Sequence, residues 1–288
     1  MVVLMNRILI YGRLIKFSHT VFALPFALAA LLLAYRQHPI GAAVLWWILL
    51  AMASARSAAM GFNRYVDYEY DRRNPRTTSR PLAAGQIDKK SVLFLVFISS
   101  SLFILSAGML GRLCLVLSVP VLSVLFFYSY TKRFTPMSHL VLGFAIGMAP
   151  VGAWIAGTGE WDMRVLPLSL ALMTYIAGFD ILYACQDIEF DRQEGLFSLP
   201  ASWNVEQALT ISSILHSFTF LFLLLNYFVF HLGPAYLGVL FLISILLVLE
   251  HKLVQPHQLE RLNFAFFHIN SVVSVLIFLA VFVDTWMT

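Results

Sequence analysis

Two short stretches of the chain carry the residues best able to do chemistry, and they are near copies of each other. The first is Asp67-Tyr68-Glu69-Tyr70-Asp71-Arg72, and the second is Asp187-Ile188-Glu189-Phe190-Asp191-Arg192. If each continues as helix at about 100° per residue, residues spaced by four or seven share one face. The faces comprise Asn63, Asp67 and Asp71 in the first copy and Asp180, Asp187 and Asp191 in the second. We therefore expect two acidic faces at the ends of two apolar helices.

Carboxylates gathered at one place need a counter-charge, because like charges repel. A hard divalent cation is the natural partner, and Mg²⁺ typically takes one or two carboxylates while phosphate oxygens and water complete its octahedron. Asn63 would add a neutral oxygen ligand. Basic side chains suited to gripping a polyanion lie in the same loops, at Arg72, Arg73, Arg76, Arg80, Lys132 and Arg133. This combination indicates a diphosphate held through Mg²⁺.

The composition is that of a membrane protein. Of 288 residues 60% are hydrophobic and 12% are charged, and the mean hydropathy is +0.82. The net charge of +4 comes from basic residues in short loops, which favours a role in membrane orientation over nucleic-acid binding. We expect no removed signal peptide. Cys114 and Cys185 are isolated in apolar surroundings, which indicates neither a disulfide framework nor a thiolate metal site.

Breaks at charged or Pro/Gly-rich positions separate nine apolar runs, each near the ~20 residues that a spanning helix needs. The runs lie at 17–35, 41–64, 91–110, 112–130, 138–157, 165–186, 207–230, 234–251 and 264–286. The acidic stretches close the second and sixth runs. We therefore predict an all-α integral membrane protein, a single transmembrane domain over residues 1–288, built as a leading helix followed by two four-helix repeats.

Most of the 19 Lys and Arg residues fall on the side of the N-terminus. The positive-inside rule then places the N-terminus and both acidic stretches in the cytoplasm, and we expect a bacterial inner membrane. The loop at 72–90 is the longest basic one. Pro75, Pro81 and Gly85 argue against a continuous helix through it, and we expect it to act as a lid over the carboxylates.

Other functions are compatible with parts of this pattern. Carboxylates at helix ends can be solvated interfacial residues, although Asp180 lies inside an apolar run, where an ionisable residue is costly. A transporter could use the acidic repeats as an ion site, but its acids would be expected at the membrane midplane. A CDP-alcohol phosphotransferase would carry Asp-Gly-x-x-Ala-Arg, which is absent. We expect contact with membrane lipid, and nothing in the sequence points to an obligate protein partner.

The motifs as a set resemble those of the UbiA superfamily of intramembrane prenyltransferases. Asn-x-x-x-Asp-x-x-x-Asp at 63–71 is followed by Arg76-Thr77-Thr78-Ser79-Arg80-Pro81-Leu82, and Asp-x-x-Tyr-x-x-x-Asp-x-x-x-Asp lies at 180–191. The stretches at 15–25 and 128–132 are also similar to that family. The resemblance covers essentially the whole chain.

This resemblance implies Mg²⁺-dependent transfer of a polyprenyl group from polyprenyl diphosphate to a ring carbon of an aromatic acid, in ubiquinone or menaquinone biosynthesis. It implies two Mg²⁺ ions that bridge the diphosphate, with ligands at Asn63, Asp67, Asp71, Asp187 and Asp191. It further implies diphosphate contacts from Lys132, Arg72 and Arg80. Asp180 and Tyr183 would line the cavity, and Asp180 joins the four motif aspartates as a catalytic residue. Departure of diphosphate would leave an allylic cation, which alkylates the ring before a ring proton is lost.

The acceptor is less defined by the motifs. Hydroxybenzoate enzymes of the family often carry Gly-x-Lys-Ser after the second motif, whereas Phe197 replaces that lysine here. In this respect the chain is more similar to a subgroup linked to the futalosine route to menaquinone, so 4-hydroxybenzoate and a dihydroxynaphthoate both stay open. An acceptor carboxylate needs a cation, for which Lys16 and Arg56 are candidates. Lys16 and His19 could instead be interfacial residues at a helix end.

Overall fold

The computed structural model describes residues 9–254 and 265–287, and these residues form helices and no strands. Within this described part, eight helical segments are long and apolar enough to cross a membrane. The helices on which they are built are α3 (Ala42–Val66), α5 (Lys89–Leu110), α6 (Arg112–Thr131), α7 (Ser138–Thr158), α8 (Leu166–Ala184), α11 (Val205–Phe230), α12 (Pro234–Leu253) and α14 (Asn270–Met287). The chain is a multi-pass, all-α membrane protein, as predicted.

The first predicted run, 17–35, does not form one spanning α-helix. It begins as the 3-10 helix η1 (Phe17–Phe22), and α2 (Leu24–Tyr35) then has 12 residues with Pro25 in its first turn. Twelve residues of α-helix are about 18 Å long, less than the ~30 Å hydrocarbon core of a bilayer. Proline favours a helix start at this point, because its missing N–H would have no intrahelical partner there.

The chain divides into two compact units, and their boundaries do not follow the predicted repeats. Unit 1 contains residues 1–20 and 45–130, and unit 2 contains residues 21–44 and 131–288. As a result α7, expected in the first repeat, lies in unit 2 together with α2. Each unit carries one of the two acidic motifs.

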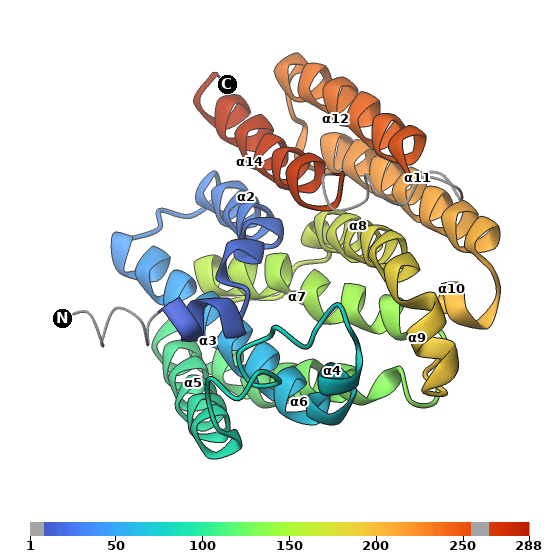
Figure 1. The fold of residues 1–288 in the computed structure, drawn as a ribbon. Helices are drawn as coiled ribbons and strands as arrows, with labels where there is room; N and C mark the ends of the chain where they lie inside the picture. Colours follow the sequence, from blue (N-terminus) through green and yellow to red (C-terminus); the bar gives the residue numbers. More distant parts are fainter. Residues whose placement is uncertain (1–8, 255–264, 288) are drawn as a thin grey trace. The chain divides into compact units, whose positions relative to one another are not determined.

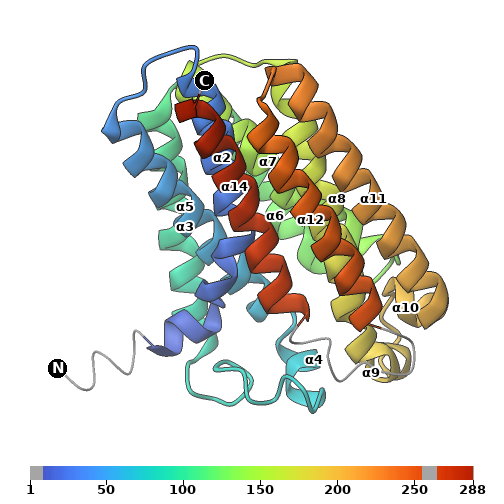
Figure 2. The ribbon, with the colours of Figure 1, turned by 90° about the horizontal axis from the view of Figure 1, so that it is seen from above.

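Six helices of unit 2 pack as a closed circuit. Contacts join α2 to α7, α7 to α8, α8 to α11, α11 to α12, α12 to α14, and α14 back to α2. Figures 1 and 2 show α12 between α11 and α14. Asp284 of α14 connects three of these helices at one end. It forms an ion pair at 3.1 Å with Arg36, which directly follows α2. It also accepts a hydrogen bond from the backbone N–H of Gly233, which directly precedes α12.

Small residues allow α7 and α8 to approach closely. A Cβ atom on Gly143 would overlap the backbone oxygen of Met173, and one on Gly147 would lie 2.9 Å from the Met173 Cβ. Ser169 of α8 also donates a hydrogen bond to the Gly147 carbonyl. Gly143-x-x-x-Gly147 is therefore a helix-packing motif.

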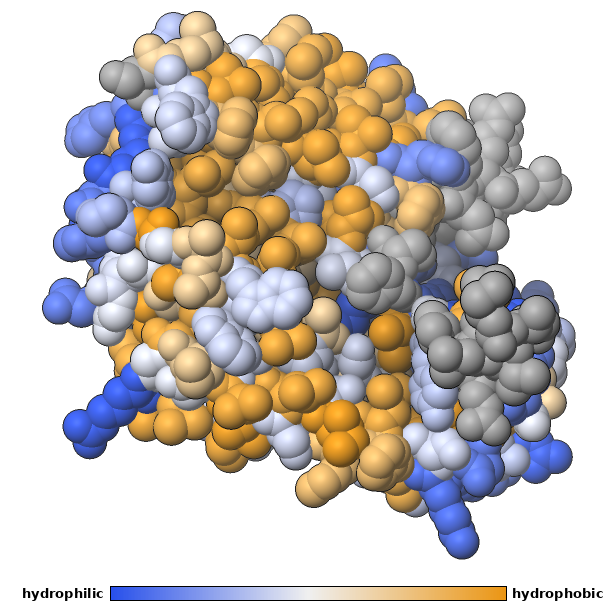
Figure 3. Space-filling model, turned by 90° about the vertical axis from the view of Figure 1, so that its left-hand side faces the viewer, coloured by the Kyte–Doolittle hydropathy of each residue, from blue (hydrophilic) through white to orange (hydrophobic). Residues whose placement is uncertain are grey.

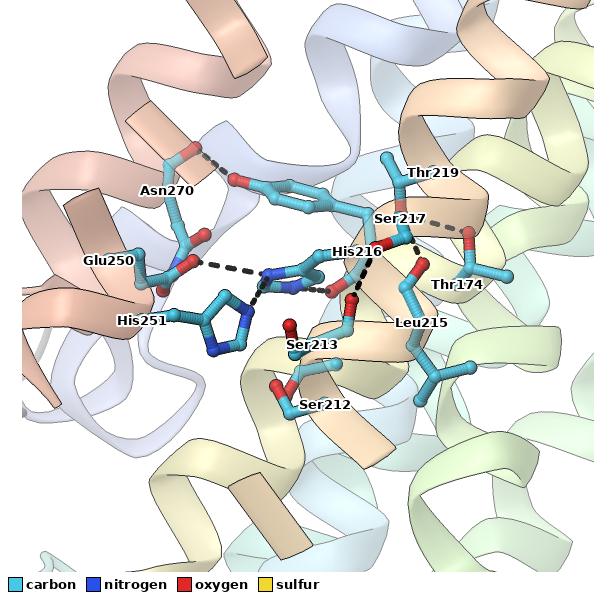
Figure 4. Close-up of polar contacts among 12 residues, drawn as sticks. Thr174, Ser212, Ser213, Leu215, His216, Ser217, Thr219, Glu250, His251 and Asn270 are labelled. Carbon is cyan, nitrogen blue, oxygen red and sulfur yellow. Dashed lines mark hydrogen bonds and ion pairs between the residues drawn. The ribbon is translucent and has the colours of Figure 1, made fainter. Parts of the chain in front are cut away.

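A buried polar network lies among α8, α11, α12 and α14 (Figure 4). The Nδ1 atom of His216 lies 3.0 Å from Nε2 of the neighbouring His251 ring and 3.5 Å from Glu250 Oε2. Asn270 donates to Glu250 Oε1 at 2.7 Å, and Tyr175 donates to the Asn270 carbonyl at 2.8 Å. Buried polar groups are costly unless paired, so this network ties the four helices to one relative arrangement.

In unit 1, α3 contacts α5 and α6. A Cβ atom on Gly61 would lie 3.0 Å from Val96 of α5, and the Phe62 ring lies 4.4 Å from that of Phe126 on α6. The loop after the first motif has no continuous helix, as predicted. It is packed rather than loose, because Leu82 is buried in one cluster with Leu14 and Val92. Its role as a lid stays a prediction.

The outer surfaces of the long helices are apolar. Large exposed hydrophobic side chains include Phe94, Phe97, Phe228, Phe241 and Trp286. On the face drawn in Figure 3, hydrophobic residues make up most of the surface and hydrophilic residues gather toward its edges. Such surfaces suit contact with lipid chains, where water is absent.

Candidate functional site

The first motif is interrupted at Asp67. Helix α3 ends at Val66, and Asp67 has φ −89° and ψ 10° before the six-residue helix α4 (Tyr68–Arg73). The expected continuous helix is therefore broken here, although backbone hydrogen bonds still join Asp67 to Asn63 and Asp71 to Asp67. The Asn63 side-chain amide donates to Asp67 Oδ2 at 2.9 Å, which brings these two predicted ligands together.

Asp71 is buried and paired with two arginines. Its Oδ1 accepts a hydrogen bond from Arg80 at 2.6 Å, and its Oδ2 lies 3.6 Å from Arg64. Arg64 also donates to Asn63 Oδ1 at 3.4 Å. The sequence prediction included Arg80 and missed Arg64. The signal for Arg64 was available, because a cation in the last turn of an apolar helix needs a partner.

A group of cations surrounds Lys16 in unit 1. Arg56 donates a hydrogen bond to the Lys16 carbonyl at 3.0 Å, and Lys16 itself has a φ of 47°. Burial, together with the charges of nearby arginines, lowers the pKa of the Lys16 ammonium to about 7. Those arginines are Arg64, Arg80, Arg76 and Arg56. His19, three residues after Lys16, is half-buried. Cations held this close favour binding of an anion.

Arg72 lies apart from these pairs. Its side chain is exposed, and its guanidinium lies 5.5 Å from the centre of the Tyr68 ring. Glu69 is exposed as well and forms a surface pair with Lys89 at 3.5 Å. Of the first motif's acidic residues, Asp71 is therefore buried and Asp67 partly so, whereas Glu69 faces outward.

The second motif repeats the geometry of the first. Helix α8 ends at Ala184, a 3-10 turn η3 (Cys185–Asp187) follows, and Asp187 has φ −109° and ψ 8° before the six-residue helix α9 (Ile188–Gln193). The expected helix is again broken at the first aspartate of the motif. Asp187 and Asp191 are buried, whereas Glu189 and Arg192 are exposed, as are their counterparts in the first motif.

Asp191 is paired with Lys132, which brings two of the predicted site residues together. Lys132 Nζ lies 3.4 Å from Asp191 Oδ2. The loop after the second motif is also bound to the backbone of Lys132, because the Phe197 N–H donates a hydrogen bond to the Lys132 carbonyl at 2.6 Å. Phe197, the residue that replaces the family's lysine, is exposed.

Asp180 is held by a histidine that the sequence prediction missed. The Nδ1 atom of His139, in the first turn of α7, lies 2.7 Å from Asp180 Oδ2. The Asp180 side chain is 20% exposed, and that of His139 is 1% exposed. Tyr183, one turn further along α8, is partly buried. No spacing rule links positions 139 and 180, so only the packing of α7 against α8 could reveal this pair.

The donor chemistry of both halves fits a hard cation. Asn63, Asp67 and Asp71 offer oxygen atoms in unit 1, and Asp187 and Asp191 offer them in unit 2. Within the described residues, no three His, Cys, Asp or Glu side chains are grouped tightly enough to hold a metal ion by themselves. A site of one or two carboxylates completed by phosphate and water is the arrangement that Mg²⁺ prefers.

Comparison with known proteins places these features in a family context. The family model described as "UbiA prenyltransferase family" matches residues 23–272. A protein named 4-hydroxybenzoate octaprenyltransferase, from Vibrio campbellii, is 29% identical over 246 residues, which cover 84% of this chain and 85% of that protein.

Two solved structures have the same fold. The structure of a UbiA homologue from Aeropyrum pernix K1 is 31% identical, with a TM-score of 0.84, and covers 92% of this chain and 98% of that chain. A UbiA homologue from Archaeoglobus fulgidus, described as bound to GPP and Mg²⁺, is 19% identical with a TM-score of 0.69, and covers 96% of this chain and 99% of that chain.

Proposed function

This chain belongs to the UbiA prenyltransferase family and is a transferase, and on that premise we propose that it transfers a polyprenyl group from polyprenyl diphosphate to a ring carbon of an aromatic acid. The observation that supports this most is the matched pairing of a buried aspartate with a cation in each motif. Asp71 pairs with Arg80, and Asp191 pairs with Lys132. Each pair combines a metal ligand with a phosphate ligand, which is what a metal-bound diphosphate needs.

We assign Mg²⁺ as the cofactor, with two ions that would share Asn63, Asp67, Asp71, Asp187 and Asp191 as their ligands. Bound Mg²⁺ supplies Lewis-acid assistance to the departure of diphosphate. Arg80 pairs with Asp71 and Lys132 pairs with Asp191, and in the proposed reaction both cations would donate hydrogen bonds to the diphosphate oxygens. Arg72, exposed on α4, adds a further positive charge for the same group.

The reaction needs a site that holds charge at one end and excludes water at the other. Breaking the allylic C–O bond releases diphosphate and leaves positive charge on the terminal isoprene unit. A ring carbon of the acceptor then forms the new C–C bond, and the ring loses a proton to regain aromaticity. The apolar helices bury the isoprene chain, and each buried methylene contributes about 0.8 kcal/mol to binding. Donor affinity should therefore rise with chain length.

The aromatic acceptor has no long apolar chain and must be recognised by polar contacts. We propose that its carboxylate binds in the group of cations around Lys16 and Arg56. The side chain of Arg56 already holds the Lys16 turn through its hydrogen bond to the Lys16 carbonyl. A phenolic or naphtholic acid, 4-hydroxybenzoate or a dihydroxynaphthoate, suits this site and places the enzyme in ubiquinone or menaquinone biosynthesis. The name of the Vibrio relative supports the former.

We also propose that the enzyme lies in a bacterial inner membrane, with its N-terminus and its site on the cytoplasmic side. The basic loops around the two motifs support this orientation. Residues 1–288 would then form a single functional domain, although they pack as two compact units.

Purified protein incubated with labelled prenyl diphosphates of several lengths and a panel of aromatic acids tests the proposal. We expect a prenylated acid in the presence of Mg²⁺ and none in excess chelator. The decarboxylated analogue of the preferred acid should be a poor acceptor. Full turnover in chelator would contradict the metal assignment, and equal turnover of the acid and its analogue would contradict the carboxylate site.

A further inference from the structure

His139 joins two elements that lie far apart in the sequence. Its Nδ1 contacts Asp180 Oδ2 at 2.7 Å, and its Nε2 lies 3.4 Å from the backbone nitrogen of Leu199. Leu199 begins the short helix α10 (Leu199–Ser202), which follows the loop after the second motif. All three residues lie in unit 2. The imidazole is therefore held at both of its nitrogen atoms.

These two contacts determine where the ring proton lies. A backbone N–H can only donate, so Nε2 of His139 must accept and cannot carry a proton. The single proton of the neutral imidazole is then on Nδ1, from which it donates to the Asp180 carboxylate. In a doubly protonated ring, the Nε2–H of His139 would face the backbone N–H of Leu199, and neither group could accept a hydrogen bond from the other. The contact with Leu199 thus selects the tautomer in which the imidazole can donate a hydrogen bond to Asp180.

This bond leaves half of the carboxylate free for other partners. Within the described part of the chain, Asp180 Oδ1 has no hydrogen-bond partner. The side chain is 20% exposed, so the residue is not sealed inside the protein. A carboxylate bound through one oxygen can no longer rotate freely, and its second oxygen is directed by the first. Such outer partners commonly orient the groups that contact substrate.

We propose that His139 is a positioning residue for the transfer reaction, holding the Asp180 carboxylate in one rotamer with its second oxygen available to the substrate. This proposal rests on the proposed function, because it assigns Asp180 to the reacting site. His139 itself need not touch substrate, since it is 1% exposed. Its effect would pass through Asp180 alone.

The competing interpretation is that His139 only anchors the loop before α10. That interpretation depends on the Nε2 contact with Leu199, whereas the positioning role depends on the Nδ1 contact with Asp180. The two contacts can be removed separately. Asparagine places an amide near the Nδ1 position of histidine, and glutamine places one near the Nε2 position. His139→Asn can therefore keep the bond to Asp180, and His139→Gln can keep the bond to Leu199.

The decisive measurement is kcat, together with the KM of donor and of acceptor, for wild type, His139→Ala, His139→Asn and His139→Gln. We expect His139→Ala and His139→Gln to lose about 10- to 100-fold in kcat, the usual cost of removing an orienting partner. His139→Asn should retain most of the activity. The KM of the prenyl diphosphate should change little in all three. Melting temperatures in detergent report whether each variant folds.

The opposite order, with Gln active and Asn inactive, would show that His139 anchors the loop, and would overturn the proposal. Unchanged kcat in His139→Ala would overturn it as well. If wild type transfers no prenyl group to any acid, the proposed function fails instead, which is a different outcome from a reversed order of variants.

Two further measurements do not depend on every variant folding. In an Asp180→Asn background, adding His139→Gln, which removes the Nδ1 contact, should cause little further loss of activity, because both residues act through one contact. A full additional loss would contradict the proposal. Nitrogen NMR of wild-type protein labelled at histidine should show a buried ring protonated at Nδ1, absent in His139→Gln. If the signal that disappears in His139→Gln comes from a ring protonated at Nε2, the assignment is overturned, even in protein that shows no turnover.

Discussion

Individual residues of the two motifs distribute their charges alike. In each copy the last aspartate is buried beside a cation, while the glutamate two residues before it is exposed. Asp and Glu carry the same charge, so the difference in burial separates groups that can hold a ligand from groups that face water. The carboxylates of Asp67 and Asp187, at the break in each motif, belong to the first kind in the proposed function.

Asp67→Asn and Asp187→Asn should each lose about 100-fold or more in kcat, because each weakens a proposed Mg²⁺ ligand and with it the Lewis-acid assistance to the departing diphosphate. Glu69→Gln and Glu189→Gln are matched controls, since they change the same charge at exposed positions of the same motifs. These controls should stay close to wild type. The kcat of prenyl transfer is measured with all four purified variants. Equal losses of kcat in the aspartate and glutamate variants would contradict the assignment of Asp67 and Asp187 to the site.

The ammonium of Lys16 gives a pH dependence to acceptor binding. Because burial and nearby arginines lower its pKa to about 7, Lys16 is charged below that pH and neutral above it. If it binds the acceptor carboxylate, the KM of the aromatic acid should rise as the pH increases above about 7. A Lys16→Arg variant keeps its charge throughout, since guanidinium is not deprotonated in proteins.

The KM of the Lys16→Arg variant should therefore be flatter with pH than that of wild type. Steady-state kinetics across this range, with the donor saturating, make the comparison. A wild-type KM that is independent of pH would remove Lys16 from the acceptor site.

Among the helices, the contact of α7 with α8 depends on the absence of side chains at two positions. A Cβ atom on Gly143 would overlap the Met173 backbone oxygen, whereas nothing lies within 4 Å of the position that a Cβ on Gly152 would occupy. Gly143→Ala should therefore lower stability by about 1–3 kcal/mol through overpacking. Gly152→Ala, on the same helix, should not destabilise. Melting of detergent-purified protein compares them, and equal melting temperatures would contradict the packing account.

The network of Glu250, Asn270 and His216 connects α12 to α14 and α11 (Figure 4). Glu250→Gln keeps an oxygen for the Asn270 amide and gains a donor for His216 Nδ1, so its stability should stay within about 1 kcal/mol of wild type. Glu250→Ala leaves the Asn270 amide and His216 Nδ1 without this partner and should lower the free energy of unfolding by about 1–3 kcal/mol for each group left unsatisfied.

Thermal melting in detergent distinguishes these two variants. The reverse order, with Gln the more damaging, would indicate that the network requires the negative charge of Glu250 and not its hydrogen bonds.

For the molecule as a whole, the orientation in the membrane can be tested with single cysteines. Thr78 follows the first motif and Glu160 follows α7, and both side chains are exposed. In a background that lacks Cys114 and Cys185, a cysteine at position 160 should react with an impermeant thiol reagent added to intact cells. A cysteine at position 78 should react only after the membrane is opened. The opposite labelling would invert the topology and move the site away from the cytoplasm.

Local sequence is enough to establish the class of protein. Apolar runs of ~20 residues are decided by local composition, because every backbone group in lipid must be satisfied within its own helix. The repeated motifs and the small-residue stripe at Gly143 and Gly147 are likewise local patterns. The all-α membrane fold, the transferase activity and the role of that stripe in helix packing could therefore be predicted from the sequence alone.

The bends of the motifs and the partners of their side chains depend instead on tertiary packing. The breaks at Asp67 and Asp187 override the helical periodicity of the motifs. The pairing of Asp180 with His139 joins positions 41 residues apart, and that of Lys132 with Asp191 joins positions 59 apart. Such contacts are set by how helices pack and not by local sequence, because a side chain's neighbours across a helix interface have no fixed spacing along the chain.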